Sequence, residues 1–153
     1  MSNAYNNIEI DKIIDSEQFE FPLNIAMASA WVMGNLKGSN LKIYNMSEKS
    51  SLADYFVIGS MSNSVQANAA AEEISFQLKR LGYPSKSIEG KDGADWVLLD
   101  HGDIIVHIFL DVSRDNYALD QLWGDCKQVE IPQEYYFSGS DESGNNESGE
   151  SYF

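Results

Sequence analysis

The chain has 153 residues, of which 43% are hydrophobic, and this is enough for one domain with one core. Its net charge of −14, with 10 lysines and arginines in all, excludes a phosphate-binding surface, so we expect no direct contact with nucleic acid. No apolar run approaches the roughly 20 residues of a membrane span, the acidic N-terminus is unlike a targeting peptide, and the single cysteine cannot form an internal disulfide. We therefore expect a cytoplasmic protein without membrane contact.

The acidic residues divide the chain into three parts. Residues 1–22 contain five acidic residues and one basic residue, and residues 133–153 contain five acidic residues. The segment 138–150 consists of Ser, Gly, Asn, Asp and Glu, which is typical of disorder. We predict an acidic N-terminal arm over 1–20, an α/β domain over 21–132 and an acidic, disordered tail over 133–153.

The first half of the chain predicts one helix and two strands after the N-terminal segment, which is either a frayed arm or a short helix. Apolar residues at three- and four-residue spacing follow Pro22 and predict a helix that ends near Gly38. Alternating residues predict a strand over 41–44. A mostly apolar run predicts a second, more buried strand over 54–59.

The second half predicts a helix, a short strand, a hairpin and a last helix. The first of these helices begins at the polar residues 62–64 and ends at Gly82. A short strand over 85–88, a hairpin over 94–109 and a helix from about residue 113 to Cys126 follow. This order predicts an α/β fold, a mixed sheet with helices mainly on one side.

Within the hairpin, two hydrophobic runs flank His101-Gly102, which predicts a two-residue turn. The opposed pairs are then Asp100 and Asp103, Leu98 and Ile105, and Trp96 and His107. One face is aliphatic and consists of Val97, Leu99, Ile104, Val106 and Ile108. The other consists of Trp96, Leu98, Asp100, Asp103, Ile105, His107 and Phe109. We expect the aliphatic face to be core, while an indole beside an imidazole is typical of a recognition surface.

The sequence contains few side chains that could act in catalysis or bind a metal. His101 and Cys126 lie far apart in the sequence with no further ligand at zinc spacing, so we expect neither a metal nor a cofactor. His107 has no paired nucleophile or carboxylate, and we interpret it as a partly buried histidine held by one hydrogen bond, with a contact role as the alternative. Asp100 and Asp103 offer a shared metal or proton across the turn, but such aspartates more often serve turn geometry.

The step Gly59-Ser60, with Ser62 and Ser64 at a helix N-terminus, has the pattern of a phosphate cradle. A nucleotidyltransferase would add two alternating aspartates that hold magnesium. Here the adjacent pair Glu72-Glu73 lies within a helix instead, and adjacent helical side chains diverge. Helix capping explains the serines better, and a nucleotide-binding or nucleotidyltransferase-like enzyme is the alternative function.

The last predicted helix carries an apolar stripe and a separate polar pair. The stripe consists of Leu119, Leu122, Trp123 and Cys126, and core packing explains it. Tyr117 lies off the stripe near Arg114. A tyrosine and an arginine beside the Trp96 face have the composition of a binding hot spot.

Several segments occur together in a characteristic order. They are Leu52-Ala53-Asp54-Tyr55-Phe56-Val57-Ile58, Gln66, Ile88-Glu89-Gly90, Asp95-Trp96-Val97-Leu98-Leu99-Asp100 with Gly102-Asp103, Val106-His107-Ile108-Phe109, and Arg114, Tyr117, Leu119, Leu122 and Trp123. With these segments the chain resembles the ribosomal silencing factor family, also called the Iojap family, over roughly residues 22–126. It departs from the family pattern at Met61-Ser62-Asn63, at Val65 and at Asp120.

The resemblance implies an α/β domain related in fold to nucleotidyltransferases but without their catalytic residues, and thus no enzyme. It implies a translation repressor that binds the large ribosomal subunit through its ribosomal protein fourteen (uL14) and sterically blocks joining of the small subunit. The partner-binding residues that carry over are Trp96, His107, Tyr117, Leu122 and Trp123. Asp54 and Tyr55 match the motif without an assigned contact. A homodimer of the free protein that buries the Trp96 face is a further alternative.

Overall fold

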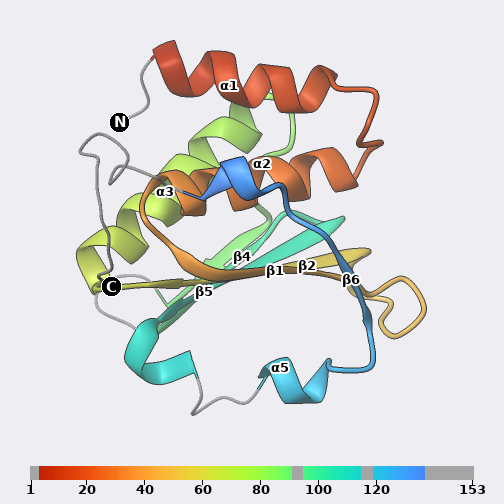
Figure 1. Cartoon of the computed structure of the whole chain (residues 1–153), viewed down its shortest axis with the longest axis vertical. Helices are drawn as coiled ribbons and strands as arrows, with labels where there is room; N and C mark the ends of the chain where they lie inside the picture. Colours follow the sequence, from red (N-terminus) through yellow and green to blue (C-terminus); the bar gives the residue numbers. More distant parts are fainter. Residues whose placement is uncertain (1–3, 91–94, 115–118, 137–153) are drawn as a thin grey trace.

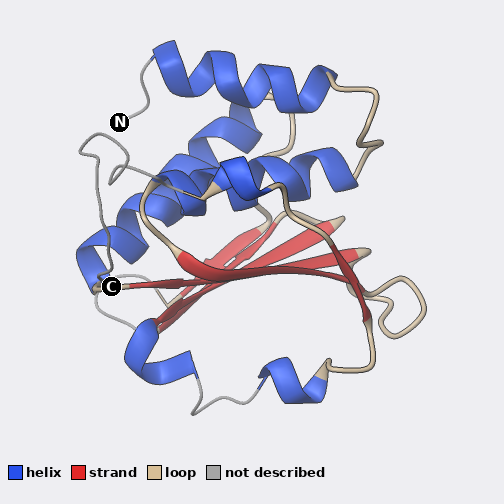
Figure 2. Ribbon diagram, in the orientation of Figure 1, coloured by secondary structure: helices blue, strands red, loops and turns tan. Residues whose placement is uncertain are grey.

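Six strands form one mixed sheet in the residues that the computed structural model describes, which are 4–90, 95–114 and 119–136. The three longer helices lie on one side of this sheet, and the short helical segments of residues 111–113 and 119–122 lie on the other (Figures 1 and 2). This arrangement confirms the predicted α/β class with helices mainly on one side. The relation to nucleotidyltransferases stays a prediction.

The sheet has a parallel pair at its centre and antiparallel pairs elsewhere. Its strands are β1 (Ser39–Asn45), β2 (Tyr55–Met61), β3 (Ser87–Glu89), β4 (Trp96–Asp100), β5 (Ile104–Leu110) and β6 (Lys127–Val129). Their order is β3-β4-β5-β2-β1-β6, and only β2 and β5 are parallel neighbours. Because parallel neighbours need a crossover, the chain passes through a helix and a hairpin before β5 returns beside β2.

The helices begin and end close to the predicted positions, except at the C-terminal end. They are α1 (Ala4–Asp15), α2 (Leu23–Asn35), α3 (Ser64–Arg80) and α5 (Leu119–Leu122), with the 3-10 turns η1 (Asp111–Ser113) and η2 (Gln133–Tyr135). The residue that caps α3 is Asn63, whose side chain accepts a hydrogen bond from the Gln66 N–H at 2.9 Å. The serines on either side of Asn63 are therefore not the cap. None of the helices in the described part of the chain combines the length and apolarity that a bilayer crossing requires.

The packed structure continues beyond both predicted domain boundaries. The N-terminal segment is a helix, and Ile10 and Ile13 of α1 are buried in the same core cluster as α2. At the other end Tyr135 of η2 is also buried in this cluster. The boundaries at residues 20 and 132 stay predictions, and the predicted tail beyond residue 136 lies outside the described residues.

Each face of the sheet has its own core. The helical face buries the aliphatic strand residues Leu41, Ile43, Val57, Val97, Leu99, Ile104, Val106 and Ile108. The opposite face, which we call the open face, buries Tyr44, Met46, Ala53, Phe56, Ile58, Ile105, Phe109 and Cys126, with Trp96, Leu98 and Trp123 partly buried. The predicted division of the hairpin's hydrophobic residues between two faces is confirmed.

The register of the hairpin differs from the predicted one. The opposed residues are Trp96 and Phe109, Val97 and Ile108, Leu98 and His107, Leu99 and Val106, and Asp100 and Ile105. Each residue of β4 therefore pairs two positions further along β5 than predicted, and the predicted pairs are wrong. Because side chains alternate with a period of two, a shift by two positions leaves every side chain on its predicted face.

The turn itself explains this shift. The His101 N–H donates to the Ile104 carbonyl at 3.0 Å, so the two-residue loop is Gly102-Asp103. The Asp100 carboxylate accepts a hydrogen bond from the Gly102 N–H at 2.8 Å, and Gly102 has a φ of +87°. A glycine in this backbone region suits the first loop position of a tight hairpin turn. Asp100 thus serves turn geometry and does not face Asp103.

The predicted last helix ends too early for its stripe to form. α5 ends at Leu122, a turn follows, and β6 begins at Lys127. Leu122 is 67% exposed, whereas Cys126 is buried. Gly124 disfavours continuation of the helix, and β6 gains ladder hydrogen bonds at the free edge of β1. Residues 115–118 of the predicted helix lie outside the described residues.

Candidate functional site

Four of the five residues predicted for partner binding lie in the described part of the chain, and they come together on the open face. Trp96 lies on β4 and His107 on β5, while Leu122 ends α5 and Trp123 follows it. α5 lies on the far side of the sheet from α2 and α3 (Figure 1). The fifth, Tyr117, lies outside the described residues.

Five rings form what we call the aromatic cluster. Its members are Phe56, Trp96, His107, Phe109 and Trp123. The prediction had not assigned Phe56 to this group, although β2 carries it next to β5. Residues 55–58 are all apolar and show no alternation, so only the pairing of β2 with β5 places that ring beside His107.

His107 lies at the centre of the aromatic cluster. Its ring centroid lies 5.1 Å from that of Phe56, 5.4 Å from Trp123, 5.8 Å from Trp96 and 6.5 Å from Phe109. The Trp96 indole N–H donates to His107 Nδ1 at 3.2 Å. The side chain is only 4% exposed. His107 is therefore a buried histidine held by one hydrogen bond from Trp96, and it supports the surface from beneath.

Burial also keeps the His107 ring neutral. It lowers the pKa of His107 from 6.5 to about 4, because a charged imidazolium would lose its hydration there. Since Nδ1 accepts the indole N–H, the ring proton lies on Nε2, which has no hydrogen-bond partner among the described residues. A neutral ring without a nearby carboxylate suits packing better than proton transfer at neutral pH.

The accessible part of this face is apolar. Trp96 and Trp123 are half-buried above His107. Leu122 is 67% exposed, and Val112 of η1 is 83% exposed. The open face thus combines two partly exposed indoles, which pack on a buried ring, with exposed aliphatic side chains from short helical segments. This is the composition of a binding surface.

Besides His107, two further rings contact Trp123 and hold it in place. Its ring makes edge contacts with Phe56, at a centroid distance of 4.7 Å, and with Tyr44, at 6.2 Å. An ion pair of 3.0 Å between Lys49 and Asp125 joins the loop before β2 to the turn after α5. The pair raises the pKa of Lys49 and lowers that of Asp125, and both groups are fully exposed. The aromatic packing therefore contributes more to positioning than the ion pair does.

Arg114 does not belong to the accessible surface. It is 5% exposed, and its guanidinium donates to Ser60 Oγ at 2.9 Å and to the Asn40 carbonyl at 2.6 Å. The predicted hot-spot pair of Tyr117 and Arg114 is therefore wrong with respect to Arg114. A buried arginine that ties β1 and β2 together was not distinguishable from a surface arginine by its position in the sequence.

The hydrogen bond between Arg114 and Ser60 also bears on the alternative interpretation of Gly59-Ser60 as a phosphate cradle. Ser60 is buried and engaged by Arg114, and the adjoining helix is capped by Asn63. Glu72 is exposed while Glu73 is buried, so the two carboxylates diverge as predicted. Within the described ranges, no group of three or more potential metal-ligating side chains gathers at one place.

The comparisons with known proteins agree with the sequence resemblance. The family model for "Ribosomal silencing factor during starvation" matches residues 22–151. A ribosomal silencing factor of Zymomonas mobilis is 51% identical over 77 residues, which cover 50% of this chain and 57% of that protein. A mouse protein named "Mitochondrial assembly of ribosomal large subunit protein 1" is 37% identical over 73 residues, covering 46% of this chain and 32% of its own length.

A solved structure shares the fold. The crystal structure of a Chromobacterium violaceum protein superposes with a TM-score of 0.65 at 27% identity, and the match covers 76% of this chain and 99% of the other. The family match includes every strand of the sheet, together with α2, α3 and the described members of the aromatic cluster, whereas α1 lies outside it. The family match, the shared fold and the motifs of the hairpin together show that the chain belongs to the ribosomal silencing factor family.

Proposed function

We propose that this chain binds the large ribosomal subunit through the open face of its sheet and sterically blocks joining of the small subunit, which represses translation. The contact on the subunit is its ribosomal protein fourteen (uL14). Occupancy of the surface is sufficient for this effect, so the mechanism needs no catalysis, metal or cofactor. The site of action is the cytoplasm, where the subunits join.

The observation that carries this proposal is the construction of the aromatic cluster. Tryptophan is enriched among residues that dominate binding energies, and here two indoles are half-buried and partly accessible. The hydrogen bond to His107 fixes the orientation of Trp96 before any partner arrives. A surface that is already ordered loses little side-chain entropy on binding.

The charge of the flanking residues favours a basic protein as partner. Exposed aspartates lie at both ends of the central strands: Asp54 precedes β2, Asp103 precedes β5, and Asp111 follows β5. Such groups repel the phosphates of RNA and attract lysine and arginine side chains. The name of the mouse relative refers to the large ribosomal subunit, which supports the choice of subunit.

Sedimentation with isolated ribosomal subunits tests the proposal. The full chain should migrate with the large subunit alone and reduce the fraction of joined ribosomes when the small subunit is added. The variant Leu122→Asp should weaken binding by at least about tenfold, because it puts a charge on an exposed apolar position of the open face. Val65→Asp is the matched control, since Val65 is 76% exposed on α3, across the sheet.

Four results would count against the proposal. If the chain does not migrate with the large subunit even at low salt, the assigned partner is wrong. If Leu122→Asp and Val65→Asp bind equally well, the assigned face is wrong. Light scattering that gives a dimer mass, lost on Leu122→Asp, would assign the open face to self-association instead. Magnesium-dependent nucleotide binding by calorimetry would support the enzyme alternative.

A further inference from the structure

A groove lies on the opposite side of the molecule, where α1, α2 and α3 meet. Its volume is about 540 Å³, which falls in the range of sites that hold a ligand or a partner's side chains. Trp31 and Val32 of α2, Leu36 directly after α2, and Phe76 of α3 supply its apolar lining. α2 and α3 cover the helical face of the sheet and α1 packs outside α2 (Figure 1), so the groove is separate from the aromatic cluster.

The apolar lining of the groove extends onto the surface. Phe76 is 48% exposed although it lies in the middle of α3. Beside the groove, Tyr5 is 57% exposed and contacts Trp31 at a centroid distance of 6.1 Å. Two exposed rings next to an apolar groove form a patch larger than a single scattered side chain.

The polar residues at the groove are acidic or neutral. Glu72 and Glu73 line it together with Asn6 and Asn35, and none of the described lining residues is basic. Glu73 accepts hydrogen bonds from the side-chain amides of Asn6, at 3.2 Å, and Gln77, at 2.8 Å. Amides satisfy a carboxylate's lone pairs but do not neutralise its charge. The groove therefore combines an apolar lining with two carboxylates.

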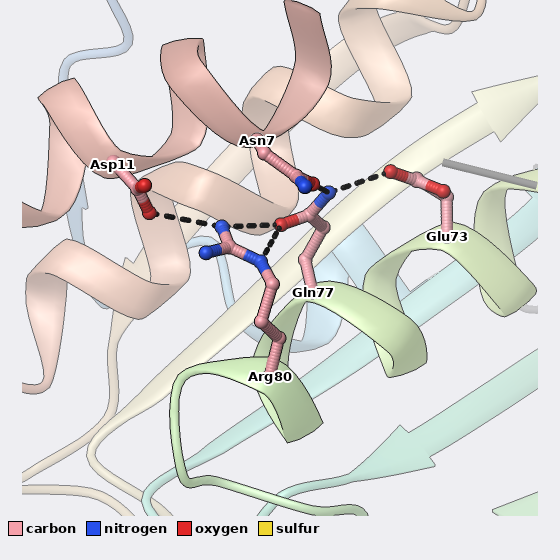
Figure 3. A network of polar contacts seen from close by, with 5 residues as sticks. All are labelled: Asn7, Asp11, Glu73, Gln77 and Arg80. Carbon is pink, nitrogen blue, oxygen red and sulfur yellow. Dashed lines mark hydrogen bonds and ion pairs between the residues drawn. The ribbon is translucent and has the colours of Figure 1, made fainter. Parts of the chain in front are cut away.

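α3 ends with two basic residues, Lys79, which is exposed and lies one helical turn from Phe76, and Arg80, which is engaged by α1. Figure 3 shows that Arg80 points to Asp11 of α1 and to Gln77, with distances of 2.9 Å and 2.7 Å. Gln77 in turn donates to Asn7 of α1 at 2.8 Å. This network fixes α1 against α3. The wall that α1 contributes to the groove is therefore held in place in the free protein.

We propose that this groove is a docking site for a partner protein that inserts an apolar side chain flanked by lysine or arginine. Charge complementarity selects this occupant, because the apolar group fills the lining while the basic groups face Glu72 and Glu73. A second copy of the chain is disfavoured by its own net charge of −14. The groove and the aromatic cluster lie on opposite sides of the sheet, so the site is separate from the proposed contact with the large subunit.

Fluorescence anisotropy with a defined peptide tests this proposal on the full chain. The probe is a labelled peptide of about 15 residues with leucines at helical spacing and lysines elsewhere. One control peptide replaces the leucines by serine, and another replaces the lysines by glutamate. The lysine–leucine peptide should bind saturably, and both control peptides should bind at least about tenfold more weakly.

Two variants with matched controls locate the site. Ala69→Trp fills the groove, because Ala69 is an exposed lining residue, and Ser51→Trp adds similar bulk in an exposed loop outside the lining. Glu72→Lys reverses the charge at the groove, and Glu48→Lys makes the same change in an exposed loop outside the lining. Each groove variant should weaken peptide binding by at least about tenfold, while its control leaves it unchanged. Circular dichroism confirms that all four fold.

Several outcomes would overturn the proposal. Equal binding of the serine-substituted peptide would mean that charge alone attracts it, and equal binding by Ala69→Trp would place the peptide elsewhere. A dimer by light scattering that Ala69→Trp abolishes would assign the groove to a second copy. Because Ala69→Trp leaves the open face intact, sedimentation with the large subunit should be unchanged, so failure here is distinct from failure of the proposed function.

Discussion

Leu98 and Leu99 are neighbours in β4 and lie on opposite faces of the sheet, in different surroundings. Leu99 is fully buried among aliphatic side chains beneath α2 and α3. Leu98 is half-buried on the open face, where α5, η1 and connecting loops give only partial cover. Long helices can bury a continuous aliphatic surface, whereas short segments leave indoles and aliphatic side chains accessible. The comparison teaches that one face is built for stability and the other retains apolar surface for recognition.

The neighbouring leucines give the largest expected effect. Leu99→Ala should lower the free energy of unfolding by about 2–5 kcal/mol, because it leaves a cavity in the helical face. Leu98→Ala should cost about 1 kcal/mol, because that side chain is only half-buried. Urea unfolding of both variants measures the difference. Equal losses would show that the two faces contribute alike to stability.

The pH dependence of unfolding sharpens the comparison on the open face. The folded-state pKa of His107, about 4, lies below the ordinary 6.5, so the unfolded chain takes up the proton first. The contribution of the neutral His107 ring to the free energy of unfolding is fully present above about pH 6.5. The free energy of unfolding should fall by about 3 kcal/mol as the pH drops from there to about 4.

A histidine variant separates this effect from that of the carboxylates. Urea unfolding of His107→Gln between pH 7 and 4.5 should give a flatter profile than that of the native chain. His101→Gln is the comparison variant, since burial also lowers the pKa of His101 while a hydrogen bond to the Tyr83 carbonyl opposes this. A His107→Gln profile as steep as the native one would show that the ring is not held neutral.

Gly34→Ala tests the outer layer of the helical face. A Cβ at this position would collide with the backbone carbonyl of Tyr135, which the flexible end of a side chain cannot relieve. The free energy of unfolding should fall by about 1–3 kcal/mol as η2 shifts from α2. Thermal denaturation measures the loss. Gly82→Ala is a poor control because of its left-handed backbone, whereas Ala69→Gly on α3 gives a baseline for small changes in a helix.

The smallest effect on stability is expected for the ion pair between Lys49 and Asp125, next to α5 on the open face. Asp125→Asn removes the ion pair with Lys49, whose two groups are fully exposed. Exposed pairs contribute little in water, so thermal denaturation should show no measurable change. A clear loss of stability would mean that this ion pair, rather than the packing of Trp123, holds the turn after α5.

Much of the candidate site could be predicted from alternation within the hairpin. Because side chains alternate between the two faces, any even shift in register leaves Trp96 and His107 on the same face. The observed shift by two residues therefore did not move them to another face. The register itself could not be predicted, because it depends on the hydrogen bond between Asp100 and Gly102. The sequence predicts a partly buried His107, but its near-complete burial depends on Phe56 and Trp123, which come from distant segments.

The sequence by itself determined those features that arise from local periodicity and from breaks in it. It placed the start of α2 after Pro22, the end of α3 near Gly82 and the two faces of the hairpin, because these depend on neighbours a few residues apart. Only the tertiary structure decided that Arg114 is buried at Ser60, that the chain leaves α5 to form β6, and that α1 completes a groove with α2 and α3. Burial, edge pairing and clefts depend on which distant segment arrives beside a residue, and no local pattern carries that information.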